Sequence, residues 1–134
     1  MTRYAVPISA KGIVFDEGKI WLRKNERNEW ELPGGKVDEG EQPMETVVRE
    51  LKEELGMVVQ VERIVQAWMY TINVSQDESR GVLVVSYLCT LLEETGVFEL
   101  EGEAGRASFG RFSPEEIVDL PMPDFYKIAI REAL

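Results

Sequence analysis

Histidine is absent from the 134-residue sequence, and Cys89 is its single cysteine. Imidazole-based triads and zinc sites of the histidine type are therefore excluded, and an internal disulfide cannot form. General acid–base chemistry must use carboxylates, lysine, tyrosine or metal-bound water. Cys89 lies inside the apolar run 82–92, which predicts a buried strand residue rather than a disulfide partner.

Long apolar runs are also missing. No stretch approaches the roughly 18 residues that indicate a membrane span, and residues 1–7 lack the apolar core of a signal peptide. We therefore expect a cytoplasmic protein that does not bind membranes. A length of 134 residues, with 44% hydrophobic and 30% charged residues, predicts one globular domain over residues 1–134.

Positive charge is scarce, since 15 Lys and Arg face 25 Asp and Glu, for a formal net charge of −10. Binding to duplex nucleic acid depends on Lys and Arg that displace counterions from phosphates. The balance therefore argues against a duplex nucleic acid as partner. A small polyanionic substrate would need cations gathered locally.

Runs of β-branched and aromatic residues between turn signals predict the strands of the fold. They are expected over residues 10–15, 20–23, 30–32, 58–74, 81–92, 97–100 and 108–112. The first two flank an acidic turn with a glycine and predict a hairpin, and those over 58–74 and 81–92 predict a long pair.

Three helices are expected. Apolar residues at helical spacing predict a helix over 43–55, with Pro43 at its first position and Gly56 as its stop. Ser113 and Pro114 predict a short helix over 114–120, and the last helix is expected over 124–134.

The helix over 43–55 carries Glu50, Glu53 and Glu54 at i, i+3 and i+4, which places three carboxylates on one face. Like charges at this spacing destabilise a helix, and a bound cation would remove the conflict. Mg²⁺ and Mn²⁺ prefer oxygen ligands and bridge to phosphates. Taken alone, the acidic run fits a solvated helix face better than a metal site.

The surroundings of the acidic run favour the metal site. In residues 35–57, five residues separate Gly35 from Glu41, and seven more separate Glu41 from the segment 49–57. That segment reads Arg-Glu-Leu-Lys-Glu-Glu-Leu-Gly-Met. The sequence over residues 35–57 resembles the complete Nudix box, with every specified position present. The segments 30–35 and 112–117 also resemble Nudix sequences, so that the resemblance covers most of the chain.

The resemblance implies the Nudix fold, an α/β/α sandwich with a mixed β-sheet between the box helix and the C-terminal helix. It also implies that Glu50, Glu53 and Glu54 bind Mg²⁺ or Mn²⁺ with the Gly34 carbonyl as a further ligand. Arg49 would orient the carboxylates by salt bridge. The implied reaction is attack of water on phosphorus in a phosphoanhydride, with metal ions neutralising the phosphate oxygens.

The general base is left open by the resemblance. Glu53 and Glu50 are candidates within the helix, and Glu101 and Glu103 are candidates in a later loop, of which we favour Glu103. For the substrate, a small nucleotide-like molecule, the resemblance indicates Arg23 and Lys36 near the diphosphate.

Trp68 and Tyr70 are weaker candidates for stacking on the base of the substrate. Aromatic residues that alternate along a strand pack in a core more often than they stack on a base. Two rival functions stay open: a domain that binds nucleotides as a sensor without cleaving them, and a metal-independent interaction module with an acidic face. The resemblance to many dimeric family members favours a homodimer.

Overall fold

The computed structural model describes residues 5–73, 79–95 and 109–134. Its elements follow in the order β1 (Ile8–Asp16), β2 (Lys19–Lys24), β3 (Trp30–Glu31), β4 (Gly34–Lys36), α1 (Pro43–Leu55), β5 (Met57–Asn73), β6 (Ser79–Glu94), β7 (Phe109–Phe112), α2 (Pro114–Ile117) and α3 (Asp124–Ala133). Among the described residues, no helix is long and apolar enough to span a membrane.

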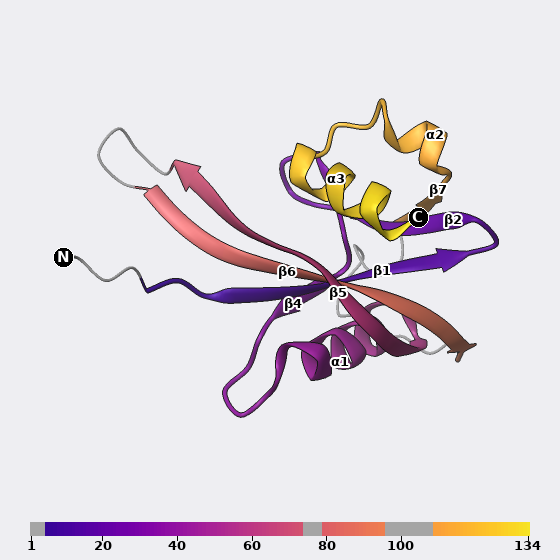
Figure 1. The fold of residues 1–134 in the computed structure, drawn as a ribbon, viewed down its shortest axis with the longest axis horizontal. Helices are drawn as coiled ribbons and strands as arrows, with labels where there is room; N and C mark the ends of the chain where they lie inside the picture. Colours follow the sequence, from indigo (N-terminus) through magenta and orange to yellow (C-terminus); the bar gives the residue numbers. More distant parts are fainter. Residues whose placement is uncertain (1–4, 74–78, 96–108) are drawn as a thin grey trace.

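The strands form a seven-stranded mixed sheet in the order β3-β2-β1-β6-β5, with β4 paired to β1 and β7 paired to β2. The β1–β6 pair is parallel, and the β1–β2, β1–β4 and β5–β6 pairs are antiparallel. Helix α1 lies on one side of the sheet, and α2 and α3 lie on the other (Figure 1). The expected α/β/α sandwich is confirmed.

Strand β1 runs through the centre of the molecule and is buried over most of its length. Ala10 and Val14 pack in a cluster with the apolar side of α1, whereas Ile13 packs in a second cluster with Phe125 and Ile130 of α3. A strand covered on both faces carries apolar residues in succession instead of alternating with polar ones. The sequence of β1 therefore fits a central strand.

Helix α1 begins and ends where the sequence predicts. Pro43 occupies its first position, the Gln42 backbone N–H donates to Glu45 Oε1 at 2.8 Å, and Gly56 follows the helix in a left-handed conformation with φ 63°. Leu51 and three other residues form its buried face. The hairpin of β1 and β2 and the long pair of β5 and β6 are confirmed as well.

The structure differs from the expected elements at two places, and a third expected element is not tested by it. The helix expected over 114–120 ends at Ile117, and a turn follows in which the Leu120 N–H donates to the Ile117 carbonyl at 3.1 Å. Strand β4 was not expected, because two glycines have low strand propensity and only pairing with β1 extends them. The strand expected over 97–100 lies outside the described residues, as does residue 108.

Replacing Leu51, which is fully buried, tests the packing of α1 against the sheet. A Leu51→Ala variant should lower the free energy of unfolding by about 2–5 kcal/mol, because it removes buried methyl groups and leaves a cavity. Denaturant unfolding followed by circular dichroism measures the change. Lys52→Ala at the neighbouring exposed position should stay within about 0.5 kcal/mol of the parent, and equal losses in both variants would contradict the packing.

Candidate active site

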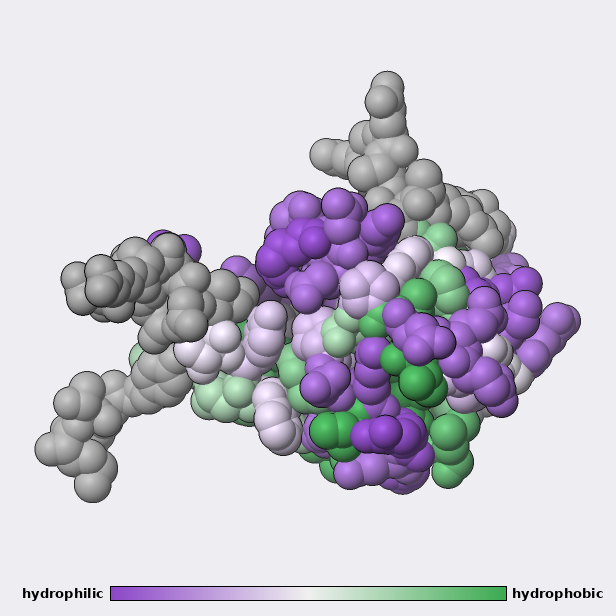
Figure 2. All heavy atoms as spheres, turned by 90° about the horizontal axis from the view of Figure 1, so that it is seen from above, coloured by the Kyte–Doolittle hydropathy of each residue, from purple (hydrophilic) through white to green (hydrophobic). Residues whose placement is uncertain are grey.

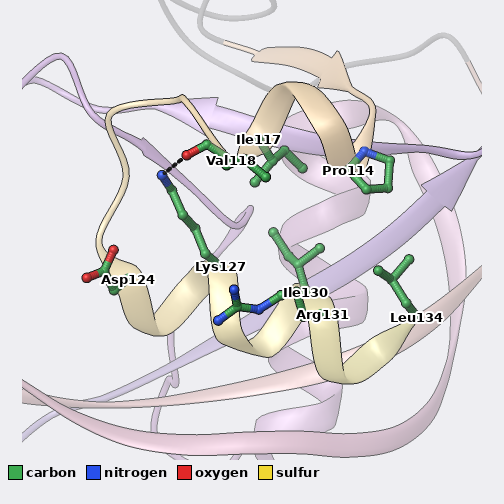
Figure 3. A pocket seen from close by; sticks show the side chains of 8 residues that line it. All are labelled: Pro114, Ile117, Val118, Asp124, Lys127, Ile130, Arg131 and Leu134. Atoms are coloured by element: carbon green, nitrogen blue, oxygen red, sulfur yellow. Dashed lines mark hydrogen bonds between the residues drawn. The ribbon is translucent and has the colours of Figure 1, made fainter.

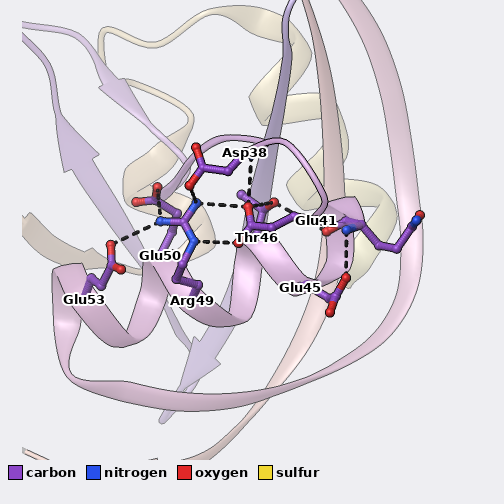
Figure 4. A network of polar contacts seen from close by, with 8 residues as sticks. Asp38, Glu41, Glu45, Thr46, Arg49, Glu50 and Glu53 are labelled. Carbon is purple, nitrogen blue, oxygen red and sulfur yellow. Dashed lines mark hydrogen bonds and ion pairs between the residues drawn. The ribbon is translucent and has the colours of Figure 1, made fainter.

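Arg49 lies at the centre of the acidic face of α1 and forms ion pairs with four carboxylates (Figure 4). Its Nη1 atom lies 3.1 Å from Glu50 Oε1 and 3.3 Å from Glu53 Oε2. On its other side, Nε lies 2.6 Å from Glu41 Oε2 and Nη2 lies 3.2 Å from Asp38 Oδ2. One guanidinium therefore forms ion pairs with two helix carboxylates and ties the preceding loop to them.

Glu41 fixes the loop between β4 and α1. Its carboxylate accepts hydrogen bonds from Arg49, from the Thr46 hydroxyl at 2.8 Å and from the Asp38 backbone N–H at 3.0 Å. The hydrogen bond from Arg49 is the main reason that the pKa of Glu41 falls to about 2, and the bonds from Asp38 and Thr46 lower it further. Glu41 therefore stays ionised and keeps the loop in place throughout the ordinary pH range.

The two glycines of β4 let the backbone approach both β1 and α1. Gly34 has a φ of 144°, and a Cβ atom there would collide with the Ala10 carbonyl oxygen. A Cβ atom at Gly35 would lie 2.5 Å from Glu50 Oε1. Only glycine fits at position 34, whereas a side chain at position 35 would displace the Glu50 carboxylate, against which the backbone of β4 lies.

Glu54 points into the protein, unlike Glu53. Its Oε2 atom is buried and has no hydrogen-bond partner among the described residues. Burial, and next the charge of Glu50, raise the pKa of Glu54 to about 7, while Lys11, Arg23 and a hydrogen bond with the Gly34 backbone act in the opposite direction. A buried carboxylate without a partner is costly unless a cation or proton compensates it.

Two cations from the strands face this region. Lys11 of β1 is 7% exposed, and its Nζ atom lies 3.7 Å from Glu31 Oε1. Arg23 Nη1 donates to the same oxygen at 3.0 Å, and Asn25 Nδ2 donates to Glu31 Oε2 at 3.2 Å. Burial would raise the pKa of Glu31, but the Lys11 charge and the hydrogen bonds from Asn25 and Arg23 together lower it. Glu31 thus holds both cations as a carboxylate.

Sequence reasoning found Arg23 but missed Lys11, Glu31 and Asn25. The signal for Lys11 was present, because it is a charged residue at the start of an otherwise apolar strand. Its pairing with Glu31 could not be found in the same way, because the two residues lie on different strands and meet only in the folded sheet.

The site residues fit a hard divalent cation in their chemistry. Among the described residues, no group of three acidic side chains converges closely enough to form a cation site as it stands, because Glu50 and Glu53 turn toward Arg49. The unpartnered Oε2 of Glu54 is nevertheless a carboxylate oxygen, the kind of ligand that Mg²⁺ and Mn²⁺ prefer, and the charge of Glu50 acts on the same carboxylate.

The other predicted site residues lie in different surroundings. Tyr70 lines a small polar cavity together with Lys11 and Glu31. Trp68 is 44% exposed and stacks on Phe125, with ring centroids 6.0 Å apart, and does not line that cavity. Lys36 is exposed on β4. Glu101 and the favoured Glu103 lie outside the described residues.

A separate hollow of about 250 Å³ lies between α2 and α3 (Figure 3). Ile117, Val118 and Ile130 contribute apolar side chains to it, and Lys127 Nζ donates to the Val118 carbonyl at 2.9 Å. The described surface on this side is mainly polar, with smaller apolar patches (Figure 2). Asp124 is the one acidic residue of the lining, so that the hollow offers no ligand set comparable to α1.

The model of the NUDIX domain matches residues 6–132, which is nearly the whole chain. The chain belongs to the Nudix family. The match spans all the elements that build the acidic site, from β1 to α3. The expectation of a Nudix-type hydrolase that acts on pyrophosphate bonds is thereby confirmed.

Individual Nudix relatives agree with this assignment. A MutT-like protein of Streptomyces ambofaciens is 28% identical over 129 residues, which cover 95% of this chain and 76% of that protein. An RNA pyrophosphohydrolase of Bartonella tribocorum is 30% identical over 124 residues, which cover 84% of this chain and 65% of that protein. The structure of a NUDIX hydrolase from Nitrosomonas europaea has a TM-score of 0.79 at 16% identity, covering 96% of this chain and 88% of that one, and shows the shared fold.

The raised pKa of Glu54 predicts a pH-dependent stability of the Nudix domain in EDTA. The pKa of Glu54 is 4.5 in the unfolded chain and about 7 in the folded protein. At pH values between these two, the folded protein retains a proton that the unfolded chain has lost. The free energy of unfolding therefore falls as the pH rises through this range. Glu54→Gln removes the penalty. The variant should exceed the parent by roughly 1–3 kcal/mol at pH 8 and match it near pH 4.5.

Denaturant unfolding at both pH values measures this difference, with Glu115→Gln on the exposed start of α2 as the control. The stability difference between Glu54→Gln and the parent could instead be the same at pH 4.5 and pH 8. That result would show that Glu54 is neither desolvated nor crowded by other negative charges.

Proposed function

We propose that this protein uses Mg²⁺ or Mn²⁺ to hydrolyse a phosphoanhydride bond in a nucleoside di- or triphosphate derivative, such as a nucleoside diphosphate linked to another group. The observation that carries the proposal is the buried, unpartnered Oε2 of Glu54 beside Glu50 on α1. A carboxylate oxygen in that position is well suited to bind a cation.

The residues that would hold the cation are Glu50, Glu53 and Glu54, with the Gly34 carbonyl as a further ligand. A bound cation would neutralise phosphate oxygens and lower the pKa of the attacking water. The side chains of Glu50 and Glu53 are 17% and 39% exposed, so that both are accessible from the surface.

Arg49 prepares this site by holding Glu50 and Glu53 at the end of α1 through ion pairs of 3.1 and 3.3 Å. Either carboxylate can accept the proton that water loses on attacking phosphorus. Glu103 remains our candidate in the loop outside the described residues. Arg49 therefore acts as a positioning residue, and one of the carboxylates acts as the base.

Arg23 is the proposed contact to the second phosphate. Its side chain is 38% exposed, and Glu31 fixes one side of its guanidinium. Its remaining N–H groups can donate charge-assisted hydrogen bonds to phosphate oxygens. Lys36 is proposed as a second phosphate contact and Tyr70 as a wall for the nucleoside, while the exposed Trp68 stays a weaker candidate for base stacking.

A nucleotide sensor without hydrolytic activity is the alternative proposal, and an acidic interaction module is a third. Retention of Glu50, Glu53 and Glu54 beside Arg49 disfavours both, because a site that only binds or only displays charge gains little from a crowded and partly buried carboxylate cluster. A small-molecule substrate, a homodimer and a cytoplasmic location remain predictions.

A substrate panel with Mg²⁺ and with Mn²⁺ tests the proposed function. It should contain nucleoside triphosphates, oxidised nucleotides, dinucleotides, nucleotide sugars, ADP-ribose and 5′-triphosphorylated RNA, with para-nitrophenyl phosphate as a monoester. At least one anhydride should be cleaved far faster than the monoester, because adjacent phosphates bridge cations and provide a stabilised leaving group. Saturable nucleotide binding without turnover would favour the sensor, and full activity in excess EDTA would exclude the metal.

Removing single carboxylates tests the site assignment. Glu53→Gln and Glu54→Gln should each lower kcat by on the order of 100-fold or more with the fold retained, because each keeps its shape but loses the charge that holds the cation. Glu50→Gln should be at least as damaging. Glu115→Gln is the control and should keep parental turnover; near-normal turnover in the Glu53 and Glu54 variants would refute the assignment.

A further inference from the structure

A cavity of about 180 Å³ lies between the sheet and the beginning of α3. Lys11 of β1, Tyr70 of β5 and Tyr126 of α3 contribute to its lining, as do Glu31 and Arg27 from the β2–β3 region. An apolar cavity of about 150 Å³ is large enough to bind benzene. The present cavity is therefore large enough to take the edge of a nucleobase, and two tyrosines are among the residues that line it.

The ammonium group of Lys11 gives this cavity its chemistry. Lys11 is 7% exposed, and among the described residues its partner is Glu31, at an ion-pair distance of 3.7 Å and with no hydrogen bond. Both Glu31 oxygens already accept shorter bonds, from Arg23 at 3.0 Å and Asn25 at 3.2 Å. The ammonium can only donate, so that a group placed beside it must offer an acceptor.

The cavity adjoins the proposed cation site. Lys11 pairs with Gly34 in the β1–β4 register, and the charges of Lys11 and Arg23 both act on the Glu54 carboxylate. A substrate whose phosphates lie near Glu54 and Arg23 can therefore extend its remaining group toward Lys11.

We propose that Lys11 determines substrate specificity by donating a hydrogen bond to a carbonyl oxygen of the nucleobase, so that the enzyme prefers an oxo-substituted base over its amino-substituted counterpart. The inference rests on the proposed function and narrows it to a substrate class. An exocyclic amino group would place donors against a buried donor, so that the ammonium gains no acceptor from the base, at a cost in free energy.

Inosine and adenosine 5′-triphosphates make a matched test, because their bases differ only along one edge of the purine ring, where inosine has a carbonyl beside a ring N–H and adenosine has an amino group beside an unprotonated ring nitrogen. With Mg²⁺, the parent should have a kcat/KM for inosine triphosphate at least about tenfold above that for adenosine triphosphate. Lys11→Met should bring the ratio near one by lowering the inosine value. Lys19→Met, at the exposed start of β2, should keep the parental ratio.

A parental ratio near one, or a ratio that Lys11→Met leaves unchanged, would overturn the inference. An equal loss for both nucleotides in Lys11→Met would assign the lysine to the phosphate chain and would overturn it as well. Lys11→Gln is the second variant if Lys11→Met does not fold; its amide accepts as well as donates, so that it should also lose the preference.

Binding of inosine and adenosine 5′-monophosphates in EDTA, measured by calorimetry, separates this inference from the proposed function. The parent should bind the inosine compound at least about tenfold more tightly, and Lys11→Met should bind both alike. If no triphosphate is hydrolysed but this difference holds, the proposed function fails and the role of Lys11 stands. Hydrolysis of both triphosphates together with equal affinities for the monophosphates, or no binding of either, would contradict the role of Lys11 alone.

Discussion

Repulsion among Glu50, Glu53 and Glu54 at the end of α1 is the constraint on which the rest of the site depends. Three negative charges within two turns of a helix repel one another. Burial of one of them adds the free-energy cost of removing that charge from water. Arg49 forms ion pairs with Glu50 and Glu53, while Glu54 turns inward and its buried Oε2 atom has no hydrogen-bond partner among the described residues. Glu41 in turn holds Arg49 from the loop.

The sheet contributes positive charges that act on one of these carboxylates, Glu54. Lys11 and Arg23 come from neighbouring strands and share the Glu31 carboxylate, while Gly34 brings β4 close enough for the backbone to contact Glu54. Two apolar clusters, one under α1 and one under α3, fix the strands that carry these groups. The fold therefore places the positive charges of Lys11 and Arg23 near the Glu54 carboxylate of α1.

Features set by local sequence could be predicted, and features set by pairing between distant segments could not. The bounds of α1 follow from Pro43, Gly56 and the helical spacing of its apolar residues, which act within a few residues of one another. Strand β4 forms only because β1 lies beside it, and the Lys11–Glu31 pair exists only across the sheet. The acidic residues of α1 could be chosen as candidates because the sequence around them, over residues 35–57, resembles the Nudix box.

Binding of Mn²⁺ followed by electron paramagnetic resonance tests the central claim directly, because it detects the cation without any substrate. The account predicts a saturable site in the parent at pH 8 that Mg²⁺ displaces, and at least about a tenfold weaker affinity in a Glu54→Gln variant that is correctly folded. Equal Mn²⁺ affinity in the parent and in Glu54→Gln, or no saturable binding to the parent, would contradict the assignment of the α1 carboxylates as the metal site.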